Sequence, residues 1–194
     1  MNFRASTIIL ILNVLIFFGT SFSTHYLDEK IVYSLICWSL DSGLFSPYQL
    51  LTSIFLHSDL IHLTFNMLLF SACAEEVEDK IGEKKFVIFY LLCGIMGTSL
   101  HLLFSNFPVI GASGAIWGIL VMWAVLSPEK VIDFRFLNFK LSLRKIVIIL
   151  FILEVLFLIF DEKSNVSNLS HIGGASTGLL LIIIDKLIKK EKPV

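Results

Sequence analysis

Six strongly apolar stretches, separated by shorter polar ones, set the pattern of this chain. Crossing the hydrocarbon layer of a membrane takes about 20 helical residues, and no water-exposed structure accommodates so much Leu, Ile and Phe. The pattern therefore predicts an all-α membrane protein, a bundle of six transmembrane helices that forms one domain over residues 1–194. The predicted helices cover residues 7–22, 48–73, 86–104, 113–126, 146–160 and 171–188. The first is expected to be a retained helix, since no small-x-small cleavage pattern precedes Thr24.

Composition supports lipid as the surrounding solvent. Hydrophobic residues make up 56% of the chain, charged residues only 16%, and the mean hydropathy is +0.86. A soluble domain of this size needs more charged surface. The net charge of −1 argues against a nucleic-acid partner.

The basic residues are distributed unevenly between the predicted loops. Thirteen of the 15 Lys and Arg lie at the N-terminus, in the 74–85 and 127–145 loops or in the C-terminal tail, and only Lys30 and Lys163 lie on the other side. Positively charged loops stay in the cytoplasm. Both termini are therefore predicted to be cytoplasmic.

The fourth predicted helix is too short to cross a membrane. From Ser113 to Ser127 an α-helix extends about 22 Å, against roughly 30 Å of hydrocarbon. Ser113 should then start well below the outer surface, and the preceding residues 105–112 should form a re-entrant loop. Such a loop is tolerated only where protein or a water-filled cavity surrounds it, and glycines such as Gly111 permit its unusual backbone.

Small residues predict which helices touch. They recur at a spacing of four in two predicted helices, as Gly114 and Gly118 in the fourth and Gly174 and Gly178 in the sixth. Such faces let two helices approach to near backbone contact. His171 precedes the second face by three residues, so this contact is expected to bring Ser113 and His171 together.

Polar side chains inside a membrane are costly and usually functional. A buried Ser beside a buried His is a nucleophile–base pair. His62 and Asn66 share one face of the second helix and could hold the oxyanion of a tetrahedral intermediate. The sequence places no Asp or Glu near His171, which predicts a dyad whose imidazole is fixed by stacking on Trp117.

No metal or cofactor is predicted. The three cysteines are odd in number, scattered and in apolar surroundings, and are interpreted as small buried hydrophobes: Cys37, Cys73 and Cys93.

These motifs resemble the rhomboid family of intramembrane serine proteases. The resemblance lies in G-A-S-G at 111–114, H-x4-H-x3-N at 57, 62 and 66, and H-x2-G-x3-G at 171, 174 and 178, in the family's order on the second, fourth and sixth helices. It covers essentially the whole chain and is similar to the minimal bacterial six-helix core. It implies an endopeptidase of the plasma membrane that cleaves transmembrane segments of other membrane proteins, with its active site toward the outer side. It also implies the Ser113 amide as a third oxyanion donor and His57 as a support. Trp117 stands where the family often has Tyr.

Two other functions compete with the protease. A catalytically inactive rhomboid-like protein that binds or escorts membrane proteins would lack Ser113 or His171, and both are present. A transporter would carry polar residues through both halves of the membrane, whereas here they cluster in the outer half.

Three polar residues keep alternative interpretations. His57 could be a packing residue, and His101 is expected to pack or to reach the interface. Glu154, midway along the fifth helix, is expected to be neutral or partnered, either in a contact within the bundle or at a gate for substrate.

Overall fold

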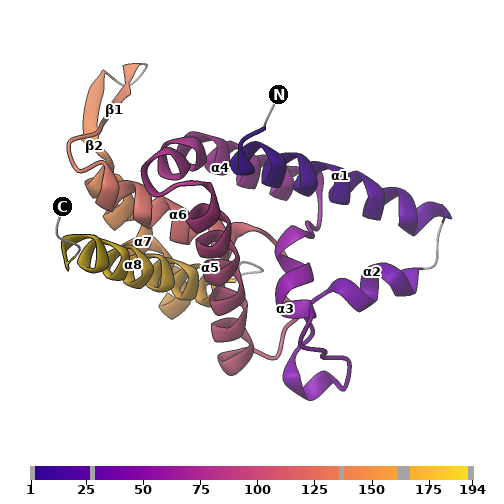
Figure 1. The fold of residues 1–194 in the computed structure, drawn as a ribbon. Helices are drawn as coiled ribbons and strands as arrows, with labels where there is room; N and C mark the ends of the chain where they lie inside the picture. Colours follow the sequence, from indigo (N-terminus) through magenta and orange to yellow (C-terminus); the bar gives the residue numbers. More distant parts are fainter. Residues whose placement is uncertain (1–2, 27–28, 136–137, 161–166, 192–194) are drawn as a thin grey trace.

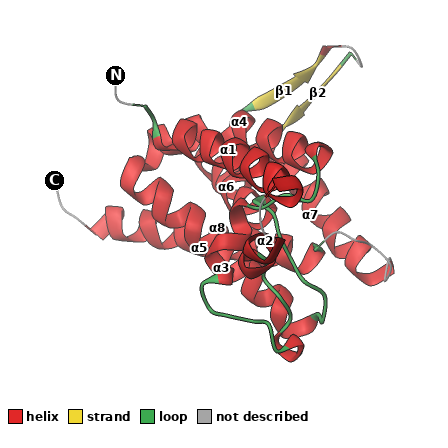
Figure 2. Ribbon diagram, turned by 90° about the vertical axis from the view of Figure 1, so that its right-hand side faces the viewer, coloured by secondary structure: helices red, strands yellow, loops and turns green. Residues whose placement is uncertain are grey.

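The computed structural model describes residues 3–26, 29–135, 138–160 and 167–191. This part of the chain is mostly helical (Figures 1 and 2). Its longer helices are α1 (Ala5–Tyr26), α4 (Leu60–Ile81), α5 (Glu83–Phe104), α6 (Ser113–Leu126), α7 (Leu143–Phe160) and α8 (Asn168–Glu191). Each predicted helix overlaps one of these. Among the described residues, α4, α5 and α8 are long and apolar enough to cross a membrane, and shorter apolar helices cover Ala5–Ser21 and Ser113–Leu126.

The second predicted helix, 48–73, has the wrong boundaries. Residues 49–55 instead form the short helix α3 (Gln49–Thr52) and the 3-10 turn η2 (Ser53–Phe55), and α4 begins only at Leu60. The cause is Asp59, which has an extended backbone and accepts a hydrogen bond of 2.8 Å from the His62 amide as the N-cap of α4. At its other end α4 continues to Ile81, so most of the predicted 74–85 loop is helical.

The stretch between α1 and α4 also contains the helix α2 (Glu29–Leu35) and the 3-10 turn η1 (Leu40–Ser42). These elements lie together on one side of the molecule, next to α3 (Figure 1). The buried Gln49 side chain joins them, because its amide donates to the Ser34 and Leu44 carbonyls at 3.1 Å each.

A β-hairpin that the hydrophobic pattern did not predict projects from the helices (Figures 1 and 2). It consists of β1 (Val131–Phe134) and β2 (Phe139–Ser142), paired antiparallel with Val131 opposite Ser142. Residues 131–134 alternate between exposed and half-buried, as expected for a strand whose successive side chains point to opposite faces. The charges of the predicted 127–145 loop therefore lie on and beside a hairpin.

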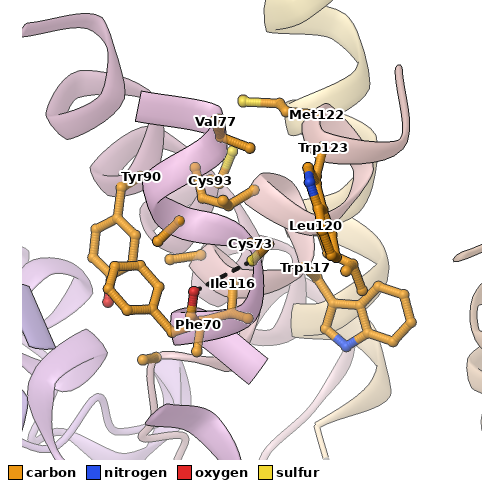
Figure 3. Close-up of a cluster of buried hydrophobic side chains, with 14 of the residues drawn as sticks. Phe70, Cys73, Val77, Tyr90, Cys93, Ile116, Trp117, Leu120, Met122 and Trp123 are labelled. Carbon is orange, nitrogen blue, oxygen red and sulfur yellow. Dashed lines mark hydrogen bonds between the residues drawn. The ribbon is translucent and has the colours of Figure 1, made fainter. Parts of the chain in front are cut away.

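The core surrounds α6. Ten of the 14 residues of this helix are buried, whereas α7 buries only Leu143 and Val147 among its described residues. Figure 3 shows Trp117 and Trp123 side by side along α6, with aromatic and sulfur-containing side chains of α4 and α5 beside it. Fully buried members of this cluster include Phe70, Cys73, Val77, Tyr90, Cys93 and Ile116. The three cysteines are free and buried, as predicted.

Helices α6 and α8 meet backbone to backbone. A Cβ added at Gly174 would lie 2.6 Å from the Gly114 carbonyl carbon, and one added at Gly178 would lie 2.6 Å from the Gly118 Cα. Real Cβ atoms essentially never approach this closely. The predicted pairing of the two glycine faces is therefore confirmed, and it fixes the relative height of the two helices.

Candidate active site

The glycine contact brings Ser113 and His171 together. Ser113 is the first residue of α6, and His171 lies in the first turn of α8, beside the Gly114–Gly174 contact. Its Nε2 atom is 2.8 Å from the Ser113 Oγ, and the His171 residue is only 8% exposed. An imidazole nitrogen at hydrogen-bond distance from a half-buried hydroxyl can remove its proton and so activate it as a nucleophile.

Trp117 lies one turn below Ser113 and packs on the imidazole. The ring centroids of Trp117 and His171 are 6.0 Å apart, and the ring planes are inclined by 31°. The expected stacking is thus a tilted contact rather than a parallel one. It restricts the imidazole from one side only.

Gly111 makes room for His62 beside the serine. Its φ of +124° lies in a region that favours glycine. A Cβ at this position would come within 2.9 Å of the His62 Cε1 and Nε2 atoms and 3.9 Å of the Ser113 Oγ. The Nε2 edge of His62 therefore faces the space next to the Ser113 hydroxyl.

The other ring nitrogen of His62 contacts Ser58, the residue before the Asp59 N-cap of α4. Its Nδ1 is 3.1 Å from the Ser58 Oγ, and that hydroxyl is 2.7 Å from the Asp59 carboxylate. Hydrogen bonds from the His62 amide and the Ser58 hydroxyl lower the pKa of the Asp59 carboxyl. The single proton of Ser58 can go to one of these two acceptors, so the tautomer of His62 depends on this cluster.

Asn66 and His57 lie close to His62 without contacting Ser113 through any described hydrogen bond. Asn66 is buried one turn along α4, and its amide donates to the His62 carbonyl at 3.0 Å. His57 is also buried and packs edge-on against the His62 ring, with a centroid distance of 5.0 Å. Both positions are compatible with a role in holding His62 in place.

Glu154 corrects the expectation that no carboxylate lies near His171. Its Oε2 atom is 2.9 Å from the His171 Nδ1 and accepts a hydrogen bond of 2.6 Å from the Asn168 amide. The oxygen lies off the direction of an Nδ1–H bond, so the contact with His171 has the distance but not the angle of a hydrogen bond. The cost of an intramembrane carboxyl predicted that Glu154 is neutral or partnered, with a protonated acid that donates a hydrogen bond to an adjacent helix as the simpler state. In the structure its Oε2 instead accepts from the Asn168 amide.

The segment before α6 is non-helical, and protein groups satisfy part of its backbone. The Val109 amide donates to the Cys37 carbonyl, and the Gly111 amide donates to the Ser53 carbonyl, each at 2.9 Å. His101 contributes a link that the sequence did not predict. Its Nε2 is 2.9 Å from the Phe107 carbonyl, and its Nδ1 is 2.6 Å from the Ser167 Oγ. This imidazole joins the end of α5, the 105–112 segment and the start of α8.

Among the described residues, no group of three His, Cys, Asp or Glu side chains is arranged to hold a metal ion.

Comparison with known proteins gives the same family along most of the chain. The rhomboid domain model matches residues 45–187. The rhomboid protease GluP of Bacillus subtilis is 38% identical over 134 residues, which cover 68% of this chain and 24% of that protein. Rhomboid-like protease 3 of Toxoplasma gondii is 28% identical over 148 residues, 71% of this chain and 51% of that protein. The inactive RHOMBOID-like protein 8 of Arabidopsis thaliana is 31% identical over 131 residues, 66% of this chain and 35% of that protein. The chain thus spans between a quarter and a half of the length of these relatives.

Proposed function

The chain belongs to the rhomboid family of integral membrane proteins, and on that premise we propose that it is an intramembrane serine endopeptidase that cleaves transmembrane segments of other membrane proteins. The observation that carries the proposal is the 2.8 Å contact between the half-buried Ser113 Oγ and the Nε2 of the buried His171, within an apolar helical bundle. Relatives named as rhomboid proteases support it.

The reaction follows from the two contacting atoms. The Ser113 oxygen attacks the scissile carbonyl while the His171 Nε2 takes the hydroxyl proton. The tetrahedral intermediate then collapses as this proton passes to the departing amine, which leaves an acyl group on Ser113. A water molecule, deprotonated by the same Nε2, attacks the acyl group and releases the new carboxyl end and the free serine.

The oxyanion of the intermediate is assigned to the space between the start of α6 and His62. The first amides of a helix have no intrahelical acceptor, and its positive end attracts negative charge. The Ser113 amide lies at this end, and the His62 Nε2 edge faces the same space across Gly111. Asn66 is proposed as a further contributor to the oxyanion hole. Its side-chain amide, which donates to the His62 carbonyl, either reaches the oxyanion directly or acts by holding His62 in place.

The six long helices support a proposed six-span topology with the 105–112 segment re-entrant. The uneven distribution of Lys and Arg supports cytoplasmic termini. With this orientation the Ser113 end of α6 faces the outer side of a plasma membrane. Because a protease needs an extended backbone at the scissile bond, the proposed substrates are transmembrane segments weakened by Gly or Pro near small residues.

Purified full-length protein in detergent, incubated with a single-span membrane protein, tests the proposal by gel electrophoresis. A fluorophosphonate should label the wild type at Ser113. Ser113→Ala should lose both labelling and cleavage and keep the wild-type melting temperature, because it removes one hydroxyl without opening a cavity of consequence. The matched control is Ser99→Ala, which removes a hydroxyl that bonds the Ile95 carbonyl within α5 and should leave both readouts unchanged.

The alternative is a non-catalytic protein that binds or escorts membrane proteins, and the similarity to the inactive Arabidopsis relative keeps it in the test. The alternative would be favoured if stable wild-type protein is not labelled, does not cleave the substrate and still co-purifies with a membrane protein.

A further inference from the structure

We infer that Glu154 is a positioning residue for His171: its carboxylate holds the imidazole as the Nδ1–H tautomer and thereby leaves Nε2 free to take the Ser113 proton. This inference rests on the proposed protease function and extends it from two residues to three. The contact that carries it is the 2.9 Å distance between the Glu154 Oε2 and the His171 Nδ1.

The surroundings of Glu154 favour an acceptor at Oε2. The buried Asn168 side chain donates to this same oxygen at 2.6 Å, and the oxygen of a carboxylate can accept from two N–H groups at once. Both partners are shielded, since the side chains of His171 and Glu154 are 11% and 15% exposed. Removal from water strengthens the attraction between a carboxylate and an imidazolium.

The proton positions decide whether Ser113 has a base. A neutral imidazole carries one proton. With that proton on Nδ1, facing Glu154, the lone pair of Nε2 faces the Ser113 hydroxyl. With the proton on Nε2, the ring would donate to the serine oxygen and could not deprotonate it. When Nε2 takes the serine proton, the resulting imidazolium keeps its Nδ1 proton beside the Glu154 carboxylate. The proton on Nε2 later passes to the departing amine, and no proton is transferred to Glu154.

Glu154 also ties a loosely packed helix to the site. Its side chain lies on the face of α7 that includes Val147 and Phe151, while most other side chains of α7 are exposed. Between α7 and its neighbours α6 and α8 lies an apolar cavity of about 370 Å³, lined by Val121, Phe151 and Leu179 among others. The contact with Asn168 and His171 therefore joins α7 to α8 near the dyad, so a displacement of α7 would withdraw the carboxylate from the imidazole.

The poor alignment of the Glu154 Oε2 with the Nδ1–H bond of His171 limits how much kcat should fall when Glu154 is replaced. A buried carboxylate that bonds its histidine in line contributes up to about 10⁴-fold to kcat, and a poorly aligned one should contribute less. Glu154→Gln should lower kcat and the rate of fluorophosphonate labelling by roughly 10- to 100-fold and leave KM unchanged. Formate should restore part of the labelling rate to Glu154→Ala, because it can supply a carboxylate in the vacated space.

The matched control is Glu76→Gln. Glu76 is a partly exposed carboxylate near the C-terminal end of α4, away from His62. There it pairs with Lys130 and accepts a hydrogen bond of 2.5 Å from the Ser127 hydroxyl. This substitution should lower the melting temperature and leave kcat and labelling unchanged. A merely structural role of Glu154 would give the same pattern, with no effect of formate.

The tautomer can be measured in the wild type, independently of how any variant folds. ¹⁵N NMR of histidine-labelled protein, with His171 assigned by His171→Gln, should show Nδ1 protonated and Nε2 unprotonated. A proton on Nε2, or unchanged kcat in folded Glu154→Gln, would overturn this inference. Neither result affects the proposed protease, which fails only if the wild type is inactive or if Ser113→Ala retains cleavage.

Discussion

The close backbone contact between α6 and α8 at Gly114 and Gly174 offers a direct test of how the site is assembled. Replacing Gly174 by Ala adds one methyl group where α8 meets α6. Alanine is the best helix former and is favoured over glycine in a helix by about 1 kcal/mol, so any loss of stability must come from the contact itself. The added Cβ would lie 2.6 Å from the Gly114 carbonyl carbon and closer still to its oxygen.

The geometry gives the size of the effect. Carbon atoms pack at about 3.5–4.0 Å, so α6 and α8 must separate locally by about 1 Å. Backbone atoms cannot rotate away as a side chain can, and overpacking of this kind costs about 1–3 kcal/mol. Gly114 follows Ser113 directly, so the 2.8 Å contact between Ser113 and His171 would lengthen to roughly 3.8 Å, beyond hydrogen-bond distance. A misplacement of about 1 Å can lower kcat by about 10²-fold.

In Gly174→Ala, the melting temperature measured in detergent and the kcat for a single-span substrate should therefore both fall. The matched control is Gly19→Ala in α1, where an added Cβ meets nothing within 4 Å. It should leave kcat unchanged and raise stability by up to about 1 kcal/mol. If Gly174→Ala kept the melting temperature and the kcat of the wild type, the close contact would be refuted. A lower melting temperature with unchanged kcat at low temperature would show that the contact does not position Ser113 and His171.

Two further predictions concern the oxyanion side of the site. Asn66→Ala should lower kcat by about 10²-fold or less, the effect of removing one oxyanion donor; a rise in KM at constant kcat would make Asn66 a substrate-binding residue. Gly111→Ala should lower kcat because its φ of +124° strains an L-residue and its Cβ would displace the His62 ring. If it acts through His62, kcat of the double variant with His62→Ala should equal that of His62→Ala alone.

The contacts that the sequence predicted correctly are those with a fixed spacing along a helix. The glycine faces at 114 and 118 and at 174 and 178 could be matched because each repeats every four residues on one side of its helix. That match alone predicts that His171 lies beside Ser113, and in the structure their side chains are 2.8 Å apart. The start of α4 was placed too early because the apolar run hides the break at Asp59, although Asp is a common N-cap.

Glu154 shows what a sequence pattern cannot supply. The cost of a carboxyl within a membrane predicted a partner, but choosing it requires the rotation of α7 about its axis relative to α8. Each residue turns an α-helix by about 100°, so an error of one position would direct the carboxylate to lipid or to another helix. Because the face of α7 toward the bundle carries no glycine repeat, the apolar pattern left this rotation undetermined, and only the packed structure identified His171.

The shortness of α6 links the fold to the chemistry. Its 14 residues extend about 21 Å, less than the roughly 30 Å of hydrocarbon, so its two ends cannot both reach water by helix alone. In the proposed topology the end at Ser113 lies within the hydrocarbon layer, and the unpaired amides of its first turn are the proposed donors to a substrate oxyanion. The proposed re-entrant segment that leads to this end would run through the same apolar depth, where each of its own amides needs an acceptor. The carbonyls of Cys37 and Ser53 supply two of these acceptors. The stretch between α1 and α4 thus has a structural role that follows from the position of Ser113: it supplies acceptors to the backbone of the segment that leads into α6.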